Sequence, residues 1–407
     1  MRLWTALLPL VVLTAPAMAD PGLPGEASVR GALDEHPSVI AARARVDAAR
    51  ADARARSKGP HEWILSGIYS RRTIDKEGTF DEFDAQLTKP FRLPGKASLD
   101  RRIGAFGVEE AENLAEDAKH QAALLLMEYW IDWLETSAEA AVDAQAVANY
   151  ETALAAVKRR VELHDAAQLD SDQSEAALGA ARTTAEESSG RAKLARARLA
   201  AQFPSLPLPA EAPEVPQPEA PEGGLDRLHG LVLSNSHEIA AADAAANRMS
   251  SMAQRARKDR LADPSFGVRL FSERGGMERG GGLVLSIPLG GGYRHALADQ
   301  ASADASAARA QAQLARFDIR ETADADLASA NFRLEAWKRA RAGLDSQMAA
   351  LLKLRRGNEL GEIDLADRLL GERMAHDAFR AEAVARAEAL RAITKLRIDS
   401  HQLWLAD

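Results

Sequence analysis

The sequence predicts a mainly α-helical chain with a small β part, in which long helices flank two short β-hairpins and the whole pattern occurs twice. Three observations predict this fold class: the positions of the 17 prolines, alternating polar and apolar residues in two segments, and landmarks that recur in both halves. Proline is excluded from helix interiors, so proline-free stretches rich in helix formers indicate helices. A period of two indicates strands.

Residues 1–19 have the features of a secretory signal peptide. Arg2 precedes an apolar run over 3–13, and Ala17-Met18-Ala19 follows it. The apolar run is about half of the roughly 20 residues that a membrane-spanning helix needs. We therefore expect cleavage, with a mature chain that begins at Asp20 in the cell envelope.

Composition excludes several classes of site. The chain has no Cys, so we expect no disulfide, no thiolate metal site and no lipid on an N-terminal cysteine. The net charge of -8 comes from interspersed acidic and basic residues, which argues against nucleic-acid binding. After the signal peptide, no apolar run reaches the 18 residues of a membrane-spanning helix, so we expect that only β-strands could cross a bilayer.

The proline map divides the mature chain. No Pro occurs between Pro94 and Pro204 or after Pro288, and both stretches are rich in Ala, Glu, Arg, Leu and Gln, which predicts unusually long helices. Seven prolines within 204–222 predict an extended linker. The predicted domains are a first repeat over 20–203 with a hairpin at about 62–90, and a second over 223–407 with a hairpin at about 264–289.

The repeat is visible in three landmarks that recur in the same order. The segment 33–42, Leu-Asp-Glu-His-Pro-Ser-Val-Ile-Ala-Ala, corresponds to 233–242, Leu-Ser-Asn-Ser-His-Glu-Ile-Ala-Ala-Ala. Pro60 corresponds to Pro264, and Leu-Thr-Lys-Pro-Phe at 87–91 corresponds to Leu-Ser-Ile-Pro-Leu at 285–289. A shared order of helix, Pro, short strand pair, Pro and long helix indicates an internal repeat.

The segments between these prolines alternate as strands of a membrane barrel do. Phe83, Ala85 and Leu87 fall on one face of the predicted strand, and polar residues fall on the other. We expect the following side chains to face a water-filled lumen: Glu82, Asp84, Gln86, Thr88, Ser265 and Arg269. Alternation alone also fits a soluble periplasmic protein with two half-buried hairpins. Four strands in lipid leave two open edges, so a membrane-spanning sheet requires neighbouring chains.

Each predicted hairpin leads into a long helix through a motif that contains Pro, Gly and a basic residue. The two motifs are Lys89-Pro90-Phe91-Arg92-Leu93-Pro94-Gly95-Lys96 and Ile287-Pro288-Leu289-Gly290-Gly291-Gly292-Tyr293-Arg294. They resemble the strand-to-helix motifs of the TolC family of outer-membrane factors. The residues that carry this resemblance are Pro90, Gly95, Lys96, Pro288, Gly292 and Arg294. The segment 356–365 is similar to the family's Gly-containing bend before its last helix, and 164–170 occupies the equivalent place in the first half without the Gly.

The resemblance implies an outer-membrane efflux channel. It implies a homotrimer in which each chain contributes four strands to a 12-stranded β-barrel and long helices to a periplasmic tunnel. The implied partners are outer-membrane lipid, a periplasmic adaptor and an inner-membrane pump of the RND type. A helix from about Lys96 to Glu135 would extend roughly 60 Å. We expect helix reversals near 136–139 and 336–343, and in the family such tips meet the adaptor.

The sequence leaves the identity of the exported substrate undecided. Leu93-Pro94-Gly95-Lys96 with Arg101-Arg102 resembles the heavy-metal efflux branch, although Ala97 and Ser98 stand where that branch usually has a basic residue. Metal cations, drugs and other small solutes therefore remain alternatives. A soluble periplasmic coiled-coil scaffold or an adaptor protein remains the alternative function.

No catalytic, cofactor-binding or metal-binding residue is expected. Gly95-Lys96 lacks the earlier Gly and the Ser or Thr of a phosphate loop, and the run Gly290-Gly291-Gly292 is better interpreted as a flexible joint. Met249 and Met252 are expected to pack between helices, and the nine His show no spacing typical of ligand pairs. We therefore expect a passive conduit and not an enzyme.

Overall fold

The computed structural model describes residues 21–405, so the expected signal peptide over 1–19 lies outside the described residues. Within them, long helices and one four-stranded antiparallel sheet confirm the predicted fold class. The elements follow one another as α1 (Glu26–Asp34), α2 (Pro37–Lys58), β1 (Ile64–Ile74), β2 (Gly78–Pro90), α3 (Lys96–Glu162), α4 (Gln168–Gln202), α5 (Leu225–Asn235), α6 (His237–Lys258), β3 (Ser265–Glu273), η1 (Arg274–Gly276), β4 (Glu278–Ser286), α7 (Gly292–Glu359) and α8 (Leu365–Asp399).

The chain forms two compact units that cut across the expected repeats. Unit 1 contains 126–219, 333–391 and the segment that ends at Ala32. Unit 2 contains 33–125, 220–332 and the segment that begins at Ala392. Both long helices contribute residues to both units, so each expected repeat does as well.

The element lengths support the interpretation of the chain as an internal repeat. α2 and α6 each have 22 residues, α3 has 67 and α7 has 68, and α4 and α8 each have 35. Each matched set occurs in the order helix, hairpin, long helix, shorter helix. Two unrelated halves would not be expected to contain helices that agree so closely in length.

The expected helix reversals near 136–139 and 336–343 are wrong. α3 continues to Glu162, about 100 Å at 1.5 Å per residue, and α7 continues to Glu359. Thr136 donates a hydrogen bond from Oγ1 to the Asp132 carbonyl at 2.7 Å, so this hydroxyl finds its partner inside the helix. A single Gly such as Gly343 costs a helix only about 1 kcal/mol, which a long packed helix tolerates.

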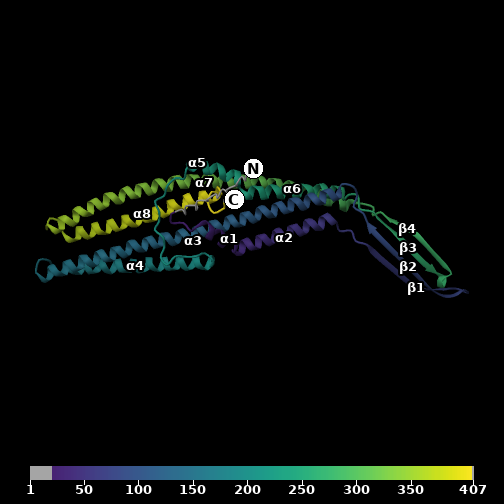
Figure 1. The fold of residues 1–407 in the computed structure, drawn as a ribbon, viewed down its shortest axis with the longest axis horizontal. Helices are drawn as coiled ribbons and strands as arrows, with labels where there is room; N and C mark the ends of the chain where they lie inside the picture. The colour runs from purple at the N-terminus through teal and green to yellow at the C-terminus, as the bar shows by residue number, and fades with distance from the viewer. Residues whose placement is uncertain (1–20, 406–407) are drawn as a thin grey trace, which may run out of the picture. The chain divides into compact units, whose positions relative to one another are not determined.

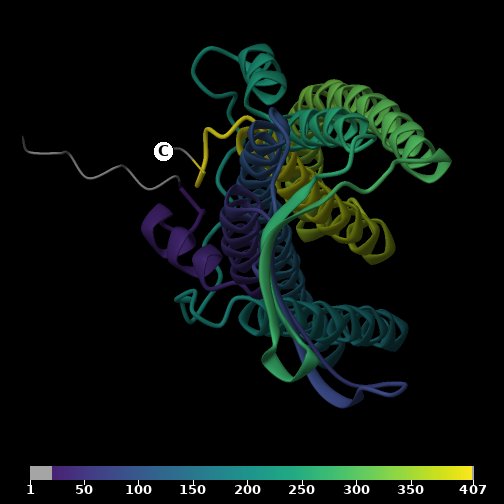
Figure 2. The same cartoon turned by 90° about the vertical axis from the view of Figure 1, so that its right-hand side faces the viewer.

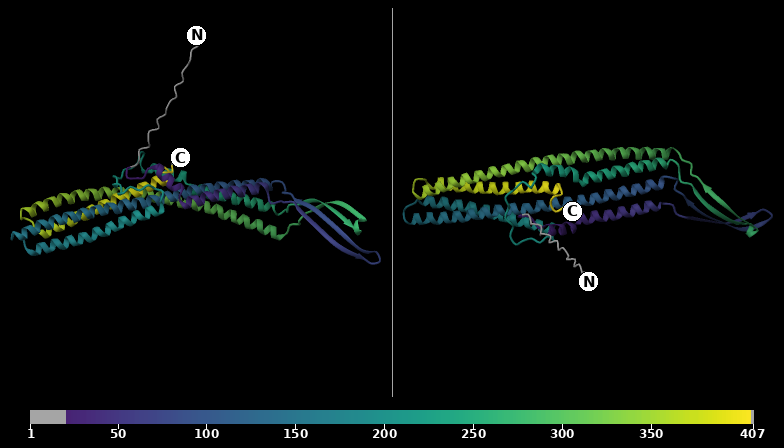
Figure 3. Two further views of the ribbon diagram at one scale, coloured as in Figure 1. Left: turned by 60° about the horizontal axis from the view of Figure 1, so that its bottom comes forward. Right: turned by 45° about the horizontal axis from the view of Figure 1, so that its top comes forward.

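The chain reverses instead at 163–167 and 360–364. His164 has φ 61° and Gly361 has φ 77°, the left-handed conformation that commonly ends a helix. The Gly-containing segment 356–365 therefore forms a helix reversal and not a bend along a helix. Its equivalent in the first half does the same without a Gly. Figure 3 shows both helix pairs folding back at these points.

Unit 1 is built from two helix pairs. α4 lies along the C-terminal part of α3, and α8 lies along the C-terminal part of α7 (Figure 3). In this unit α3 buries large apolar side chains, among them Leu126, Met127, Trp130, Ile131 and Leu134. Over 204–224 the backbone forms neither helix nor strand. Leu206 and Val215 are buried, and Arg386 of α8 donates to the Val215 carbonyl at 3.4 Å, so the part of the expected linker that belongs to unit 1 packs against it.

In unit 2, α2 lies beside the N-terminal part of α3, and α6 lies beside that of α7 (Figure 1). A Cβ on Gly104 of α3 would stand 2.8 Å from the Ala53 Cα of α2, so the two backbones nearly touch. Small residues allow such close approach, which explains the high Ala content. Met249 packs against buried Ala residues of α6 and α7 as expected, whereas Met252 is 37% exposed.

The sheet has the order β1-β2-β3-β4, with every neighbouring pair antiparallel. Its strands are curved along their length (Figure 2). Residues with positive φ make the turns: Lys76 and Gly78 between β1 and β2, and Arg274, Gly275 and Gly276 between β3 and β4. Among the residues that the structure describes, no helix is both long and apolar enough to span a membrane.

Candidate functional site: a two-faced sheet and its junctions with the helices

The register of the sheet places all six expected lumen-facing residues on one face, named here the polar face. Residues paired across antiparallel strands point to the same side. Gln86 pairs with Arg269, and Pro90 pairs with Ser265. Glu82, Asp84 and Thr88 share this side because they lie an even number of positions from Gln86.

The opposite face, named here the apolar face, carries exposed hydrophobic side chains on every strand. Leu65 pairs with Leu87, which pairs with Val268, which pairs with Leu283. The exposed fraction is 76% for Leu65 and 75% for Leu283. The other large members are Tyr69, Phe83, Phe266, Leu270 and Leu285, all more than a third exposed. A monomer in water would rarely expose so large an apolar patch.

Charges on the polar face are paired with each other. Arg269 forms an ion pair with Asp84 of the neighbouring strand. Arg72 of β1 pairs with Glu82 of β2 at 2.7 Å. Each of the two acidic side chains of β2 thus has a basic partner on a neighbouring strand, and a single-sign ring of the kind used in selectivity filters is not formed by these residues.

The first junction, between β2 and α3, is closed by a buried lysine. Lys96 is 1% exposed, and its Nζ lies 2.8 Å from Asp259 Oδ1 and 2.7 Å from Asp263 Oδ1. The same Nζ donates to the Leu261 carbonyl at 2.7 Å. The segment after α6 therefore encloses the ammonium group, and all three of its donors have an acceptor.

Several further groups hold this junction. Asp263 also accepts a hydrogen bond from the Leu93 backbone N–H at 3.0 Å. Arg92 Nη1 lies 3.0 Å from Asp100, and Arg255 Nε lies 2.8 Å from the other oxygen of that carboxylate. Gly95 has φ 83°, which Gly adopts without strain and other residues do not.

The junction lowers the pKa of its carboxyls. Burial alone would raise the pKa of Asp259 and Asp263, but hydrogen bonds from neighbouring donors outweigh this effect. For Asp259 the donors are Arg255 and Lys96, and for Asp263 they are Lys96 and the Leu93 backbone. Both pKa values lie below the ordinary value, so both groups are ionised at neutral pH.

The second junction, between β4 and α7, is much more open. Leu289, directly after Pro288, is 93% exposed, and Tyr293 is 77% exposed. Arg294 has one backbone contact, from Nη1 to the Asp259 carbonyl at 3.0 Å. Gly292 begins α7, and a Cβ there would meet no atom within 4 Å.

Sequence reasoning identified Lys96 but missed its partners. Asp259 and Asp263 lie more than 160 positions away and belong to no motif singled out in the sequence. The repeat gave no signal for them, because with Pro60 aligned to Pro264 their equivalents in the first half are Ala55 and Gly59. Asp100, which joins Arg92 and Arg255, was missed in the same way.

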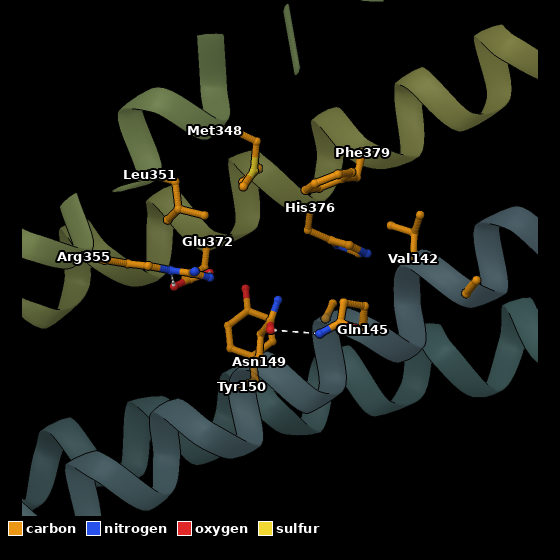
Figure 4. Close-up of a pocket in the computed structure, with 13 residues that line it drawn as sticks. Val142, Gln145, Asn149, Tyr150, Met348, Leu351, Arg355, Glu372, His376 and Phe379 are labelled. Carbon is orange, nitrogen blue, oxygen red and sulfur yellow. Dashed lines mark hydrogen bonds and ion pairs between the residues drawn. The ribbon is translucent and has the colours of Figure 1, made fainter. Parts of the chain in front are cut away.

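Unit 1 contains a cavity of about 390 Å³ between the two helix pairs. Tyr150, Asn149 and Gln145 of α3 point into it from one side, and Met348, Leu351 and Phe379 approach from the other (Figure 4). At one end, Arg355 forms a two-pronged pair with Glu372 at 2.7 and 2.6 Å. Near the other end, Asp143 accepts from His376 and from Arg380, both at 2.7 Å.

Comparison with solved structures agrees with this geometry. The chain is similar to a membrane protein from Pseudomonas aeruginosa (18% identity, 97% of this chain and 96% of that chain, TM-score 0.77). It is also similar to the outer-membrane channel OprN (19%, 93% and 90%, 0.76) and to the outer membrane protein VceC from Vibrio cholerae (15%, 93% and 95%, 0.75). Neither a family model nor a curated protein sequence matches the chain.

These similarities cover nearly the whole length of each chain. The protein therefore has the fold of OprN and VceC, and the fold expected from the two strand-to-helix motifs is confirmed.

Proposed function

We propose that this protein is the outer-membrane channel of a tripartite efflux system. In this proposal three copies join their four-stranded sheets into one 12-stranded barrel, with the apolar face toward lipid and the polar face toward the lumen. A pump in the inner membrane delivers the solutes, which then diffuse passively through the water-filled channel.

The observation that carries the proposal is the division of the sheet into two faces. The strands have 9 to 13 residues, about the length that a tilted strand needs to cross a bilayer. Lipid accepts the exposed leucines and phenylalanines of the apolar face, while the paired charges of the polar face require water.

The two edges of the sheet support assembly from several copies. β1 pairs with β2 alone and β4 with β3 alone, so each edge strand has one side unpaired within the described chain. Unpaired backbone groups are costly in lipid, which makes closure by neighbouring copies a physical requirement. β4 of one copy would then pair with β1 of the next.

The helix reversals at 163–167 and 360–364 are the proposed docking points for a periplasmic adaptor, which would connect the channel to an RND-type pump. The resemblance of the strand-to-helix motifs supports this arrangement. The segment Leu93-Pro94-Gly95-Lys96 favours heavy-metal cations as cargo. Comparing metal and drug sensitivity after gene deletion would separate these two substrate classes.

The proposal can be tested with two arginine substitutions on opposite faces of the sheet. Leu270→Arg places a charge on the apolar face, where it costs about 2 to 4 kcal/mol near the middle of a bilayer. Ser66→Arg places the same charge on the polar face. Envelope fractionation and gel migration with and without heating measure membrane location and assembly.

We expect the unsubstituted protein and Ser66→Arg to fractionate with the outer membrane as trimers that dissociate on heating. For Leu270→Arg we expect most of the outer-membrane trimer to be lost. Recovery of the unsubstituted protein as a monomer, soluble without detergent, would overturn the proposal. That result would favour the alternative function, a soluble periplasmic coiled-coil scaffold.

A further inference from the structure

Three histidines and three carboxylates from distant parts of the sequence meet in unit 2. Asp117 and His120 come from α3, His237 and Glu238 begin α6, and Asp399 and His401 lie at the end of α8 and just after it. No spacing in the sequence connects them. The export function proposed above uses none of these six side chains.

His120 is the centre of this cluster. Its Nε2 lies 2.8 Å from Asp399 Oδ1, and its Nδ1 lies 3.5 Å from Glu238 Oε1. One ligand atom from each of Asp117, His120 and Glu238 lies within 4.8 Å of the others. Both nitrogens of a buried imidazole thus face carboxylate oxygens.

The other two histidine rings lie against the same group. The ring centroids of His120 and His401 are 5.5 Å apart, and those of His237 and His401 are 4.9 Å apart. His401 has φ 60°, and the Asn235 side-chain amide donates to the neighbouring Ser400 carbonyl at 3.3 Å. The C-terminal segment is thereby held in a turn that brings His401 to the cluster.

A hollow of about 280 Å³ opens onto these groups, lined by His120, Glu238, Asp399 and His401 among others. Burial, followed by the repulsion of Glu238, raises the pKa of the Asp117 carboxyl. One cation could bridge Asp117 and Glu238, and Glu238 lines the hollow. Lys395 lines it as well, but its ammonium group is paired with Asp326 and Asp399.

We propose that this cluster binds a divalent transition-metal ion of the zinc class through Asp117, His120 and Glu238, with His401 as the fourth ligand. Imidazole nitrogen and carboxylate oxygen are the ligands that such ions combine in tetrahedral sites. With bonds of about 2.1 Å, tetrahedral ligand atoms lie roughly 3.4 Å apart. The ligand atoms of Asp117, His120 and Glu238 lie within 4.8 Å of one another, so small side-chain rotations bring these three to that spacing. The cation takes the place of the proton that His120 shares with the carboxylates.

Binding would join three segments of unit 2. α3, the start of α6 and the turn after α8 each contribute at least one ligand. A metal ion that bridges them stabilises the folded unit because the unfolded chain lacks the assembled site. This role is structural and does not depend on which solute the protein exports.

The test measures zinc binding and thermal stability on the purified full-length protein, prepared with a tag free of histidine. The substitutions are Asp117→Asn and His401→Gln in the cluster. The matched control is His229→Gln, because His229 also pairs with a carboxylate in unit 2, Asp324 at 2.7 Å, but lies outside the cluster. Metal analysis after dialysis against Zn²⁺ gives the stoichiometry, and calorimetric titration gives the affinity.

We expect one Zn²⁺ per chain and a Zn²⁺-dependent rise in Tm for the unsubstituted protein and for His229→Gln. Asp117→Asn removes a repelled carboxylate, so its Tm without metal stays equal or rises. Its zinc affinity falls at least about tenfold, and that of His401→Gln falls similarly. Absence of stoichiometric zinc, or equal binding by the cluster variants and the control, would overturn the inference whether or not the protein proves to be a channel.

Discussion

The two strand-to-helix junctions share a sequence pattern but differ in their surroundings. In the first, Lys96 is 1% exposed and lies between two aspartates of the same chain. In the second, Leu289 is 93% exposed. Arg294 stands at the same distance from its proline as Lys96 does, and within the described part of the chain it donates to a backbone carbonyl and pairs with no carboxylate. One junction is completed within the chain, and the other remains open.

In the proposed ring of copies, this difference marks the place where a neighbouring copy would pack. Within the chain, the first junction is covered by the segment that connects α6 to β3. The repeat makes the segment between α2 and β1 the equivalent cover for the second junction, but in one chain these two lie at opposite edges of the sheet. In a closed ring of copies, that segment of the next protomer would reach the second junction.

The largest effect is expected from breaking the closed junction. Lys96→Met leaves Asp259 and Asp263 without their shared cation, and removal of one partner from a buried charged group costs about 3 to 5 kcal/mol. Thermal unfolding of the purified protein measures this loss. Arg294→Met is the matched control in the open junction, and an equal loss in both variants would contradict the contrast between them.

The open junction should matter for assembly. Burying a leucine contributes about 1.5 to 3 kcal/mol, so Leu289→Glu is expected to weaken association by about 2 kcal/mol or more while the protomer still folds. Met277→Glu, at a 71% exposed position in the turn between β3 and β4, is the control. Light scattering in detergent gives the oligomeric state. Unchanged assembly in Leu289→Glu would remove this residue from the interface.

Glycine substitutions sharpen the comparison. Gly95→Ala forces a side chain onto a φ of 83° and is expected to destabilise by about 1 to 2 kcal/mol. Gly291→Ala in the open junction meets no atom within 4 Å and has ordinary φ, so it is expected to be neutral or to stabilise by up to about 1 kcal/mol. Denaturant titration of both variants checks the opposite signs.

The smallest expected effect is on the thermal stability of the protein at acidic pH. The pKa values of Asp259 and Asp263 are lowered in the folded state, so their stabilisation is present above the ordinary pKa of 3.8 and is lost as the pH falls through the lowered values. We expect Tm to fall more steeply below about pH 4 in the unsubstituted protein than in Lys96→Met. Arg294→Met should keep the steep fall, and parallel curves for all three proteins would contradict the assignment.

Local sequence patterns were sufficient to predict the helical stretches and the strands. Proline positions located the helical stretches, a period of two located both hairpins, and alternation assigned Glu82, Asp84 and Arg269 to the face where the register places them. The helix reversals were misplaced because Thr, Ser, Ala and Glu at 136–139 neither forbid a helix nor require one. The positive φ of His164 carries no strong sequence signal.

The sequence by itself determined the helical and strand segments, because propensity, proline exclusion and alternation act between residues close in the chain. Only the tertiary structure decided which charges meet. Lys96 pairs with Asp263, and His120 pairs with Glu238 and Asp399, over separations of 118 to 279 positions in the sequence. No local rule selects one carboxylate among the many in the chain. Long-range pairing is chosen by packing and by the cost of burying an unpaired charge, which depend on the whole fold.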